Sequence, residues 1–144
     1  NGQGVAQDYA EAVRLYRLAV AQGLAVAQFN LGLMFENGQG VAQDYAEAVR
    51  LYRLAAAQRL AYAQVNLGVM FANGQGVAQD YAEAARLYSL AAAQGDADAQ
   101  YNLGYMFEKG QGVAPDRAEA IRWYRLAAAQ GHALAQIRLA RLGA

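Results

Sequence analysis

The apolar positions of the chain follow helical spacing in two kinds of segment. In the first kind they recur three or four residues apart, as in Ala12, Leu15, Tyr16 and Ala19. In the second kind the corresponding stripe is Ala27, Leu31, Met34 and Phe35. Stretches rich in glycine and polar residues separate these segments. The pattern predicts amphipathic helices of two kinds that alternate along the whole chain.

The two kinds of segment recur with a period of 36 residues. Residues 1–36 and 37–72 differ at only six positions, and the copies that begin at Asn73 and Lys109 keep the same frame without an insertion. A short helix pair cannot bury its apolar face alone, whereas stacked copies bury it against one another. The sequence therefore predicts an all-α fold, an α-solenoid of stacked antiparallel helix pairs.

Helix ends are marked in each copy. Asp8 stands three residues before Glu11, a capping-box pattern in which the aspartate accepts from a first-turn N–H and the glutamate reaches back. Gly23 follows the last turn of this helix, where a left-handed residue closes a helix best. Arg59 replaces that glycine in the second copy, at a cost of about 1 kcal/mol if the left-handed geometry persists. Gly32 lies in the middle of the second helix, which predicts a close neighbour at that point.

Composition argues against several function classes. The chain has no Cys and no Thr, and its one Ser (Ser89) and one His (His132) lie in different copies. A nucleophilic triad or a zinc site needs more of these groups close together, so we expect no enzyme, metal or cofactor. With 12 basic and 12 acidic residues, and only one Lys, nucleic acid is not an expected partner. No apolar run has the roughly 18 residues of a membrane helix, and the absence of an initial Met suggests an excised or processed piece.

Three segments of the third and fourth copies carry a family resemblance. Residues 97–107, 110–113 and 116–131 contain the combined pattern A-x-A-Q-x-x-L-G, G-x-G-V and A-x-x-x-Y-x-x-A-A. In this pattern the chain resembles the Sel-one-like repeat (SLR) family, which is related to the tetratricopeptide repeat. The resemblance implies a right-handed superhelix and an adaptor that binds proteins or peptides. Some members brace each repeat with a disulfide, which this chain cannot form because it has no Cys.

The resemblance also sets the frame of the helix pairs. In that frame the helix with Ala27 and Leu31 is the first of its pair (helix A), and the helix that follows Asp44 is the second (helix B). The chain then has an unpaired helix B at 8–22, pairs at 25–58, 61–94 and 97–130, and a terminal helix A at 133–142.

Differences among the copies concentrate in helix A at four positions. The first set is Val26, Tyr62, Asp98 and Leu134, and the second is Phe29, Val65, Tyr101 and Ile137. The third set is Leu33, Val69, Tyr105 and Arg141, and the fourth is Glu36, Ala72, Glu108 and Ala144. Offsets of three, four and three residues put all four on one stripe. Variable yet mostly apolar positions indicate either a partner-binding groove or packing against the neighbouring repeat. The resemblance favours the groove, because tetratricopeptide-like arrays line their concave face with helix A.

An asparagine recurs within the same stripe, at Asn30, Asn66 and Asn102. An amide both donates and accepts, so a ladder of amides can bind the backbone of an extended peptide. The alternative is a hydrogen bond that serves only the fold.

The last helix differs from the others in charge. Arg138 takes the asparagine position and Arg141 lies three residues on, and residues 1–108 carry a net charge of −4 against +4 for the rest (6 − 10 and 6 − 2). These arginines either anchor an acidic peptide end or form the polar cap of a terminal repeat, and we favour the cap.

Two hypotheses of function follow. The first is a non-catalytic adaptor that binds an extended segment on the concave face through the helix A stripe. The second is a structural module, natural or consensus-designed, in which Leu15 and Tyr16 at one end meet Ile137, Leu139 and Leu142 of another copy. The sequence makes no prediction of compartment or of the partner's identity.

Overall fold

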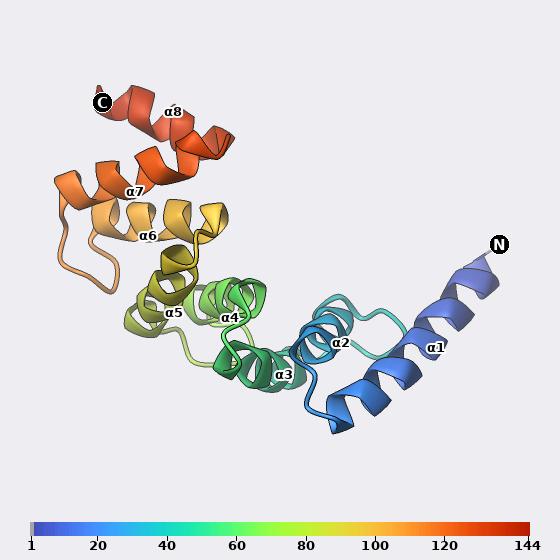
Figure 1. The fold of residues 1–144 in the computed structure, drawn as a ribbon. Coiled ribbons are helices and arrows are strands. Elements are labelled where there is room, and N and C mark those ends of the chain that lie inside the picture. The colour runs from blue at the N-terminus through green and yellow to red at the C-terminus, as the bar shows by residue number, and fades with distance from the viewer. Residues whose placement is uncertain (1) are drawn as a thin grey trace.

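The computed structural model in Figure 1 is built from eight helices within residues 2–144. It describes the backbone of these residues and the side chains of residues 4–144. The helices are α1 (Gly2–Ala21), α2 (Ala25–Asn37), α3 (Tyr45–Ala57), α4 (Ala61–Asn73), α5 (Tyr81–Ala93), α6 (Ala97–Lys109), α7 (Arg117–Ala129) and α8 (Ala133–Leu142). No strand occurs in residues 2–144, which confirms the all-α prediction. The A helices α2, α4, α6 and α8 begin 36 residues apart, as the repeat predicts.

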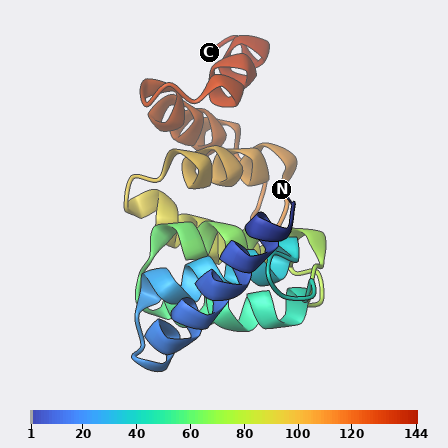
Figure 2. The ribbon, with the colours of Figure 1, turned by 90° about the vertical axis from the view of Figure 1, so that its right-hand side faces the viewer.

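The helices form a stack that bends into an arc. Each helix packs mainly against the helices before and after it in the chain. In Figure 1 the arc runs from α1 at one end to α8 at the other, with α2 and α4 on its inner side and α3 and α5 on its outer side. The view in Figure 2, turned by 90°, shows the helices layered one after another along the stack. This arrangement confirms the α-solenoid.

The predicted aspartate caps are present in the last three B helices. The side chain of Asp44 accepts from the backbone N–H of Glu47 at 3.1 Å, and Asp80 and Asp116 do the same at 3.0 Å. The second half of the capping box is wrong, because Glu47 does not reach back. Its carboxylate accepts instead from Arg50, one turn further on. A charged guanidinium is a stronger donor than an N–H group, so the ion pair wins.

Helix α1 differs from the prediction that it begins after Asp8. It begins at Gly2, although residues 1–19 and 37–55 are identical in sequence. The second copy of this segment turns because it is tied to α2: Asp44 N–H donates to Phe35 C=O at 2.9 Å, and Gln43 donates to Glu36 C=O at 2.8 Å. The described residues of the first copy make no such backbone bond to another helix, and they are helical from Gly2.

A glycine of helix A and a tyrosine of helix B hold each pair together. A methyl group on the Cα of Gly32 would lie 2.6 Å from a ring carbon of Tyr52, and the pairs Gly68–Tyr88 and Gly104–Tyr124 repeat this contact. The predicted close neighbour of the mid-helix glycine is therefore this ring. Tyr52 and Tyr124 are fully buried.

Buried glutamines join successive B helices through the A helix between them. Gln94 donates to the Oε1 of Gln64 at 2.9 Å, and the Nε2 of Gln64 lies 3.4 Å from Ala56 C=O. The pairs Gln58–Gln28 and Gln130–Gln100 have the same 2.9 Å bond. These bonds satisfy polar groups in the interior of the stack.

Candidate functional site

The first variable set of helix A lies in solvent. Val26, Tyr62, Asp98 and Leu134 are all exposed. The exposed fraction of Tyr62 is 63%, the largest among the exposed large apolar residues. The first set is therefore not covered by packing among residues 4–144, which is compatible with the predicted groove.

The second set lies partly beneath the first. Phe29, Val65 and Tyr101 are half-buried, and only Ile137 is exposed. The ring of Phe29 lies 5.8 Å from that of Tyr52 and 6.1 Å from that of Tyr62, measured between centroids. The second set is therefore compatible with both interpretations, a partner-binding groove and packing against the neighbouring repeat, because its side chains are packed on one side and exposed on the other.

In the third pair, Tyr101 repeats the arrangement of Phe29. Its ring lies 5.7 Å from that of Tyr124 and stacks on His132 at 4.8 Å. His132 also caps α8 by accepting from Ala135 N–H at 3.3 Å, and its Nε2 lies 3.1 Å from Asp98. Asp98 is thus a predicted site residue that is exposed but already contacts the imidazole of His132.

One of the three recurring asparagines lies close to a tyrosine hydroxyl. Asn30, Asn66 and Asn102 are half-buried. The Nδ2 of Asn66 lies 3.5 Å from the hydroxyl of Tyr52, at the limit of a hydrogen bond. The amide is therefore only weakly held by the fold, and it keeps the capacity to bind another group.

Two of these tyrosines have a carboxylate partner from the fourth variable set. The Tyr52 hydroxyl donates to Glu36, and the Tyr124 hydroxyl donates to Glu108 at 3.2 Å. Burial raises the pKa of both phenols, and the hydrogen bond to the glutamate raises it further. Each pair joins the last turn of helix A to the following helix B.

The middle repeat lacks this carboxylate because Ala72 takes the glutamate position. Burial alone raises the pKa of Tyr88, in contrast to Tyr52 and Tyr124. A cavity of about 280 Å³ lies at this point, between α4, α5 and α6. Its lining is Ala72, Asn73, Tyr81, Tyr88, Asn102, Tyr105, Met106 and Gln111. Two predicted site residues, Asn102 and Tyr105, thus share one hollow.

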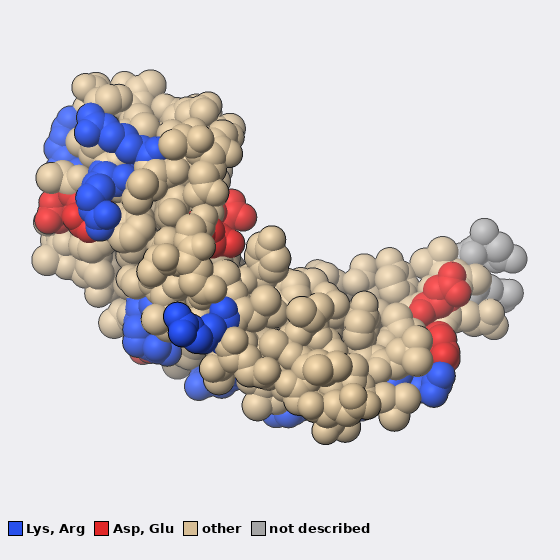
Figure 3. Space-filling model, in the orientation of Figure 1, with Lys and Arg blue, Asp and Glu red and all other residues tan. Residues whose placement is uncertain are grey.

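Arg138 is drawn into the structure rather than left free. Its guanidinium lies 3.4 Å from Glu108 and 5.1 Å from the centre of the Tyr105 ring. Arg141 is exposed. Figure 3 shows Lys and Arg side chains over the α7–α8 end of the arc and again near α5, and its inner contour is uncharged except for Asp and Glu side chains near α6 and on α1. The basic end is therefore separate from the exposed apolar positions of α2 and α4.

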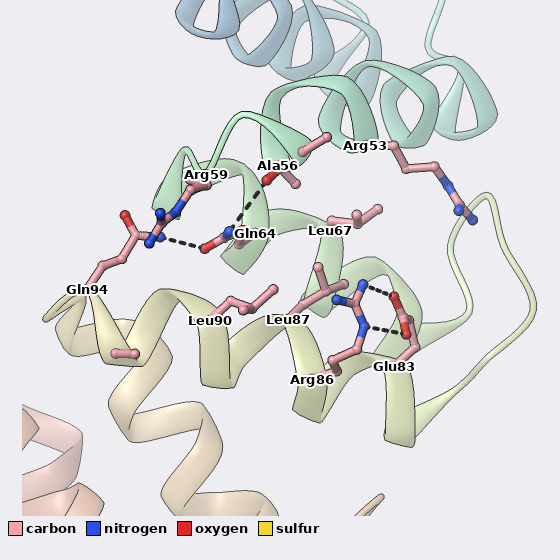
Figure 4. A pocket seen from close by; sticks show the side chains of 12 residues that line it. Arg53, Ala56, Arg59, Gln64, Leu67, Glu83, Arg86, Leu87, Leu90 and Gln94 are labelled. Carbon is pink, nitrogen blue, oxygen red and sulfur yellow. Dashed lines mark hydrogen bonds and ion pairs between the residues drawn. The ribbon is translucent and has the colours of Figure 1, made fainter.

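A larger cavity, of about 540 Å³, lies on the outer side between α3 and α5 (Figure 4). The sequence did not predict this cavity, because its lining comes mainly from the B helices of two adjacent repeats. The one unusual residue of the lining in the sequence is Arg59, which takes the glycine position. Arg59 takes a φ of 67°, so the left-handed geometry persists there. The polar groups in Figure 4 are mostly paired with one another: Gln94 with Gln64, and Arg86 with Glu83 at 2.5 Å. Of the polar side chains in its lining, only Arg53 and Arg59 have no hydrogen-bond or ion-pair partner among the residues drawn in Figure 4.

Residues 2–144 include no helix that is long and apolar enough to cross a membrane. Among the side chains that the structure describes, no three His, Asp or Glu are grouped so that they could hold a metal ion.

Three solved structures resemble the fold. A protective antigen present in uropathogenic Escherichia coli strains, which displays an SLR fold, is 44% identical with a TM-score of 0.92; the match covers 99% of this chain and 30% of that chain. A Sel1 repeat protein from Oxalobacter formigenes is 39% identical with a TM-score of 0.87, over 92% of this chain and 54% of that one. This chain therefore spans less than two thirds of either protein. Cysteine rich protein B of Helicobacter pylori, at 23% identity and a TM-score of 0.72 over 94% and 97% of the two chains, shares the fold.

Comparison with curated proteins gives no match. The model of the Sel1 repeat matches residues 1–24, 25–60, 61–96 and 97–132, which together are most of the chain. The frame of these matches is the one that pairs α2 with α3, α4 with α5 and α6 with α7. The chain therefore belongs to the Sel1 repeat family, whose members are generally non-catalytic scaffolds for protein interactions.

Proposed function

We propose that the chain is an adaptor that binds an extended segment of a partner protein along the inner side of the arc, across α2, α4 and α6. The observation that carries the proposal is the exposure of Tyr62 beside half-buried Phe29, with the half-buried Asn66 one residue beyond Val65 on α4. An exposed aromatic ring offers binding energy, and adjacent amides offer hydrogen bonds to a peptide backbone.

The spacing of the repeats suits an extended ligand. Neighbouring helices pack about 8–10 Å apart, and an extended peptide rises about 3.3 Å per residue. The asparagines of α2, α4 and α6 would then meet about every third residue of the peptide. Backbone recognition of this kind tolerates many ligand sequences, because side chains do not take part in the hydrogen bonds.

The test is selection from a random peptide library displayed on phage, with the whole chain as the target. Selected peptides are then measured by fluorescence polarisation against Tyr62→Ala and Asn66→Ala. We expect each variant to weaken binding about tenfold. Leu90→Ala is the matched control, since Leu90 is an exposed apolar residue (44%) that lines the outer cavity. Loss of binding by Leu90→Ala, with Tyr62→Ala unchanged, would move the site to the outer side.

The second candidate function is end-to-end association. Leu15 on α1 is 51% exposed and Ile137 on α8 is 48% exposed, so both ends of the stack offer apolar surface. Contacts between unlike ends do not close and would extend into filaments. Light scattering over a series of protein concentrations tests this function, and a constant monomer mass would exclude it.

A further inference from the structure

We infer that the cavity beside Ala72 is a subsite for a carboxylate side chain, Glu or Asp, of the bound segment. This inference rests on the proposed function, because the carboxylate comes from the segment that lies along α4 and α6. It names the chemistry that one repeat of the array recognises and the other two do not.

The first argument is a comparison among the three helix pairs of the same chain. In the first pair the hydroxyl of Tyr52 donates to Glu36, and in the third pair the hydroxyl of Tyr124 donates to Glu108. In the middle pair the glutamate is replaced by Ala72, while Tyr88 is retained. The middle pair thus lacks the carboxylate that accepts the hydrogen bond of the tyrosine in the other two pairs.

The second argument is that the space of the missing side chain is open. Ala72 and Tyr88 both line the cavity of about 280 Å³, which is large enough for a side chain and its water. Met106, a buried core residue, is part of the lining, so the cavity reaches the core of the stack.

The third argument is the supply of donors. Tyr88, Asn102 and Gln111 line the cavity together, and they carry one hydroxyl and two side-chain amides. No hydrogen bond joins the Tyr88 hydroxyl or the Asn102 amide to another side chain among residues 4–144, whereas Asn66 lies 3.5 Å from Tyr52. A carboxylate that enters would accept from at least two of these groups, and hydrogen bonds to a charged acceptor are the stronger kind.

The fourth argument is the charge at the rim. Tyr105 lines the cavity, and its ring has the Nζ of Lys109 at 5.8 Å and the guanidinium of Arg138 at 5.1 Å from its centre. Lys109 stands where the first two copies have Asn37 and Asn73. Arg138 is already paired with Glu108 at 3.4 Å, so Lys109 is the cation that favours a carboxylate over a neutral amide of the same shape.

The experiment uses propionate as the probe, because propionate is the glutamate side chain from its Cβ outward with one added hydrogen. We expect saturable shifts of the Asn102 side-chain NH₂ signals in ¹H–¹⁵N NMR spectra, with a Kd on the order of 10 mM for so small a ligand. Propionamide, which has the same shape without the charge, should give a Kd about tenfold higher. A linear response, or equal shifts with both probes, would overturn the inference.

Three variants make the test specific to this cavity. Ala72→Glu should abolish saturation, because it restores the internal carboxylate. Tyr88→Phe keeps the ring and removes the donor, so it should weaken propionate binding about tenfold. Glu36→Ala should create a second site, seen as new shifts at Asn66. Circular dichroism checks that each variant is folded, and an unchanged propionate response in both Ala72→Glu and Tyr88→Phe would contradict the subsite.

Peptide selection separates the subsite from the binding surface. We expect peptides selected on the natural chain to carry an acidic residue at one position, and peptides selected on Ala72→Glu to lose that preference while still binding. Inner-side binders without an acidic preference, together with no saturation by propionate, would overturn the subsite and leave the adaptor intact. Saturation by propionate without any inner-side peptide would overturn the adaptor and leave the cavity as a small-carboxylate site.

Discussion

The ring of Tyr88 packs so closely against the Cα of Gly68 that a methyl group on that carbon would lie 2.6 Å from the ring atom Cε1. Real carbon atoms do not come this close, so the contact requires glycine at the centre of α4 and an aromatic ring on α5. The same contact recurs in each helix pair. It sets the distance between helices A and B throughout the array and brings the tyrosine hydroxyl to the end of helix A.

We expect Gly68→Ala to lower the free energy of unfolding by about 2–3 kcal/mol, because the added methyl group would clash with the buried Tyr88 ring and force it to shift. Alanine would otherwise favour a helix by about 1 kcal/mol over glycine. Chemical denaturation measures the change. Gly4→Ala is the control, since Gly4 lies in α1 with nothing within 4 Å of the added carbon, and it should stabilise the chain. A Gly68→Ala variant as stable as the natural chain would contradict the packing argument.

Arg59→Gly should raise the free energy of unfolding by about 1 kcal/mol. Arg59 has a φ of 67°, which is a left-handed conformation. The equivalent residues of other copies, Gly23 and Gly95, adopt it without strain. The reverse change, Gly95→Arg, should destabilise by a similar amount, and nothing lies within 4 Å of that position to add a clash. Thermal and urea denaturation of the two variants check the prediction. Opposite signs are required, so two shifts in the same direction would refute it.

Gln94→Ala should destabilise the chain by about 1–2 kcal/mol. It leaves the Oε1 of Gln64 without its donor, in a side chain that is only 2% exposed. Gln58→Ala should act in the same way through Gln28, which tests whether the glutamine bonds are equivalent along the stack. Adding Gln64→Leu to Gln94→Ala should recover part of the loss, because the buried acceptor is then removed too. An additive double variant would contradict the predicted coupling.

Stability should fall steeply above pH 10. Burial raises the pKa of Tyr52, Tyr88 and Tyr124 above the ordinary phenol value of about 10. The folded chain therefore keeps these protons at a pH where the unfolded chain loses them. The stabilisation is fully present below pH 10 and is lost as the pH rises toward the folded-state pKa values.

Urea denaturation from about pH 8 to about pH 11 measures this dependence, with a slope of up to about 1.4 kcal/mol per pH unit for each phenol. Tyr88→Phe is the informative variant, because Tyr88 has no carboxylate partner and its loss should mainly reduce the alkaline slope. If the variant and the natural chain have the same slope, Tyr88 is not held neutral by the fold.

Much of the architecture was predictable from the residues alone. The 36-residue period, the aspartate caps at Asp44, Asp80 and Asp116, and the need for a close neighbour at Gly32 are all local or repeated signals, and the structure confirms them. They could be predicted because helix periodicity and helix ends depend on residues within a few positions of one another. The buried glutamines that join the helices were predictable for a similar reason: they recur unchanged in every copy.

The tertiary structure decided what depends on residues far apart in the chain. Residues 1–19 and 37–55 are identical, yet the first copy is helical from Gly2, whereas the second turns where Asp44 N–H donates to Phe35 C=O of α2. In the same way, Phe29 is half-buried because the ring of Tyr52, in the same helix pair, and the ring of Tyr62, in the next pair, lie beside it. Ala72 lines a cavity because Tyr88 and Asn102 stand beside it. Burial and hydrogen-bond partners are properties of neighbours in space, and in this array those neighbours lie on adjacent helices, many helical turns away along the chain.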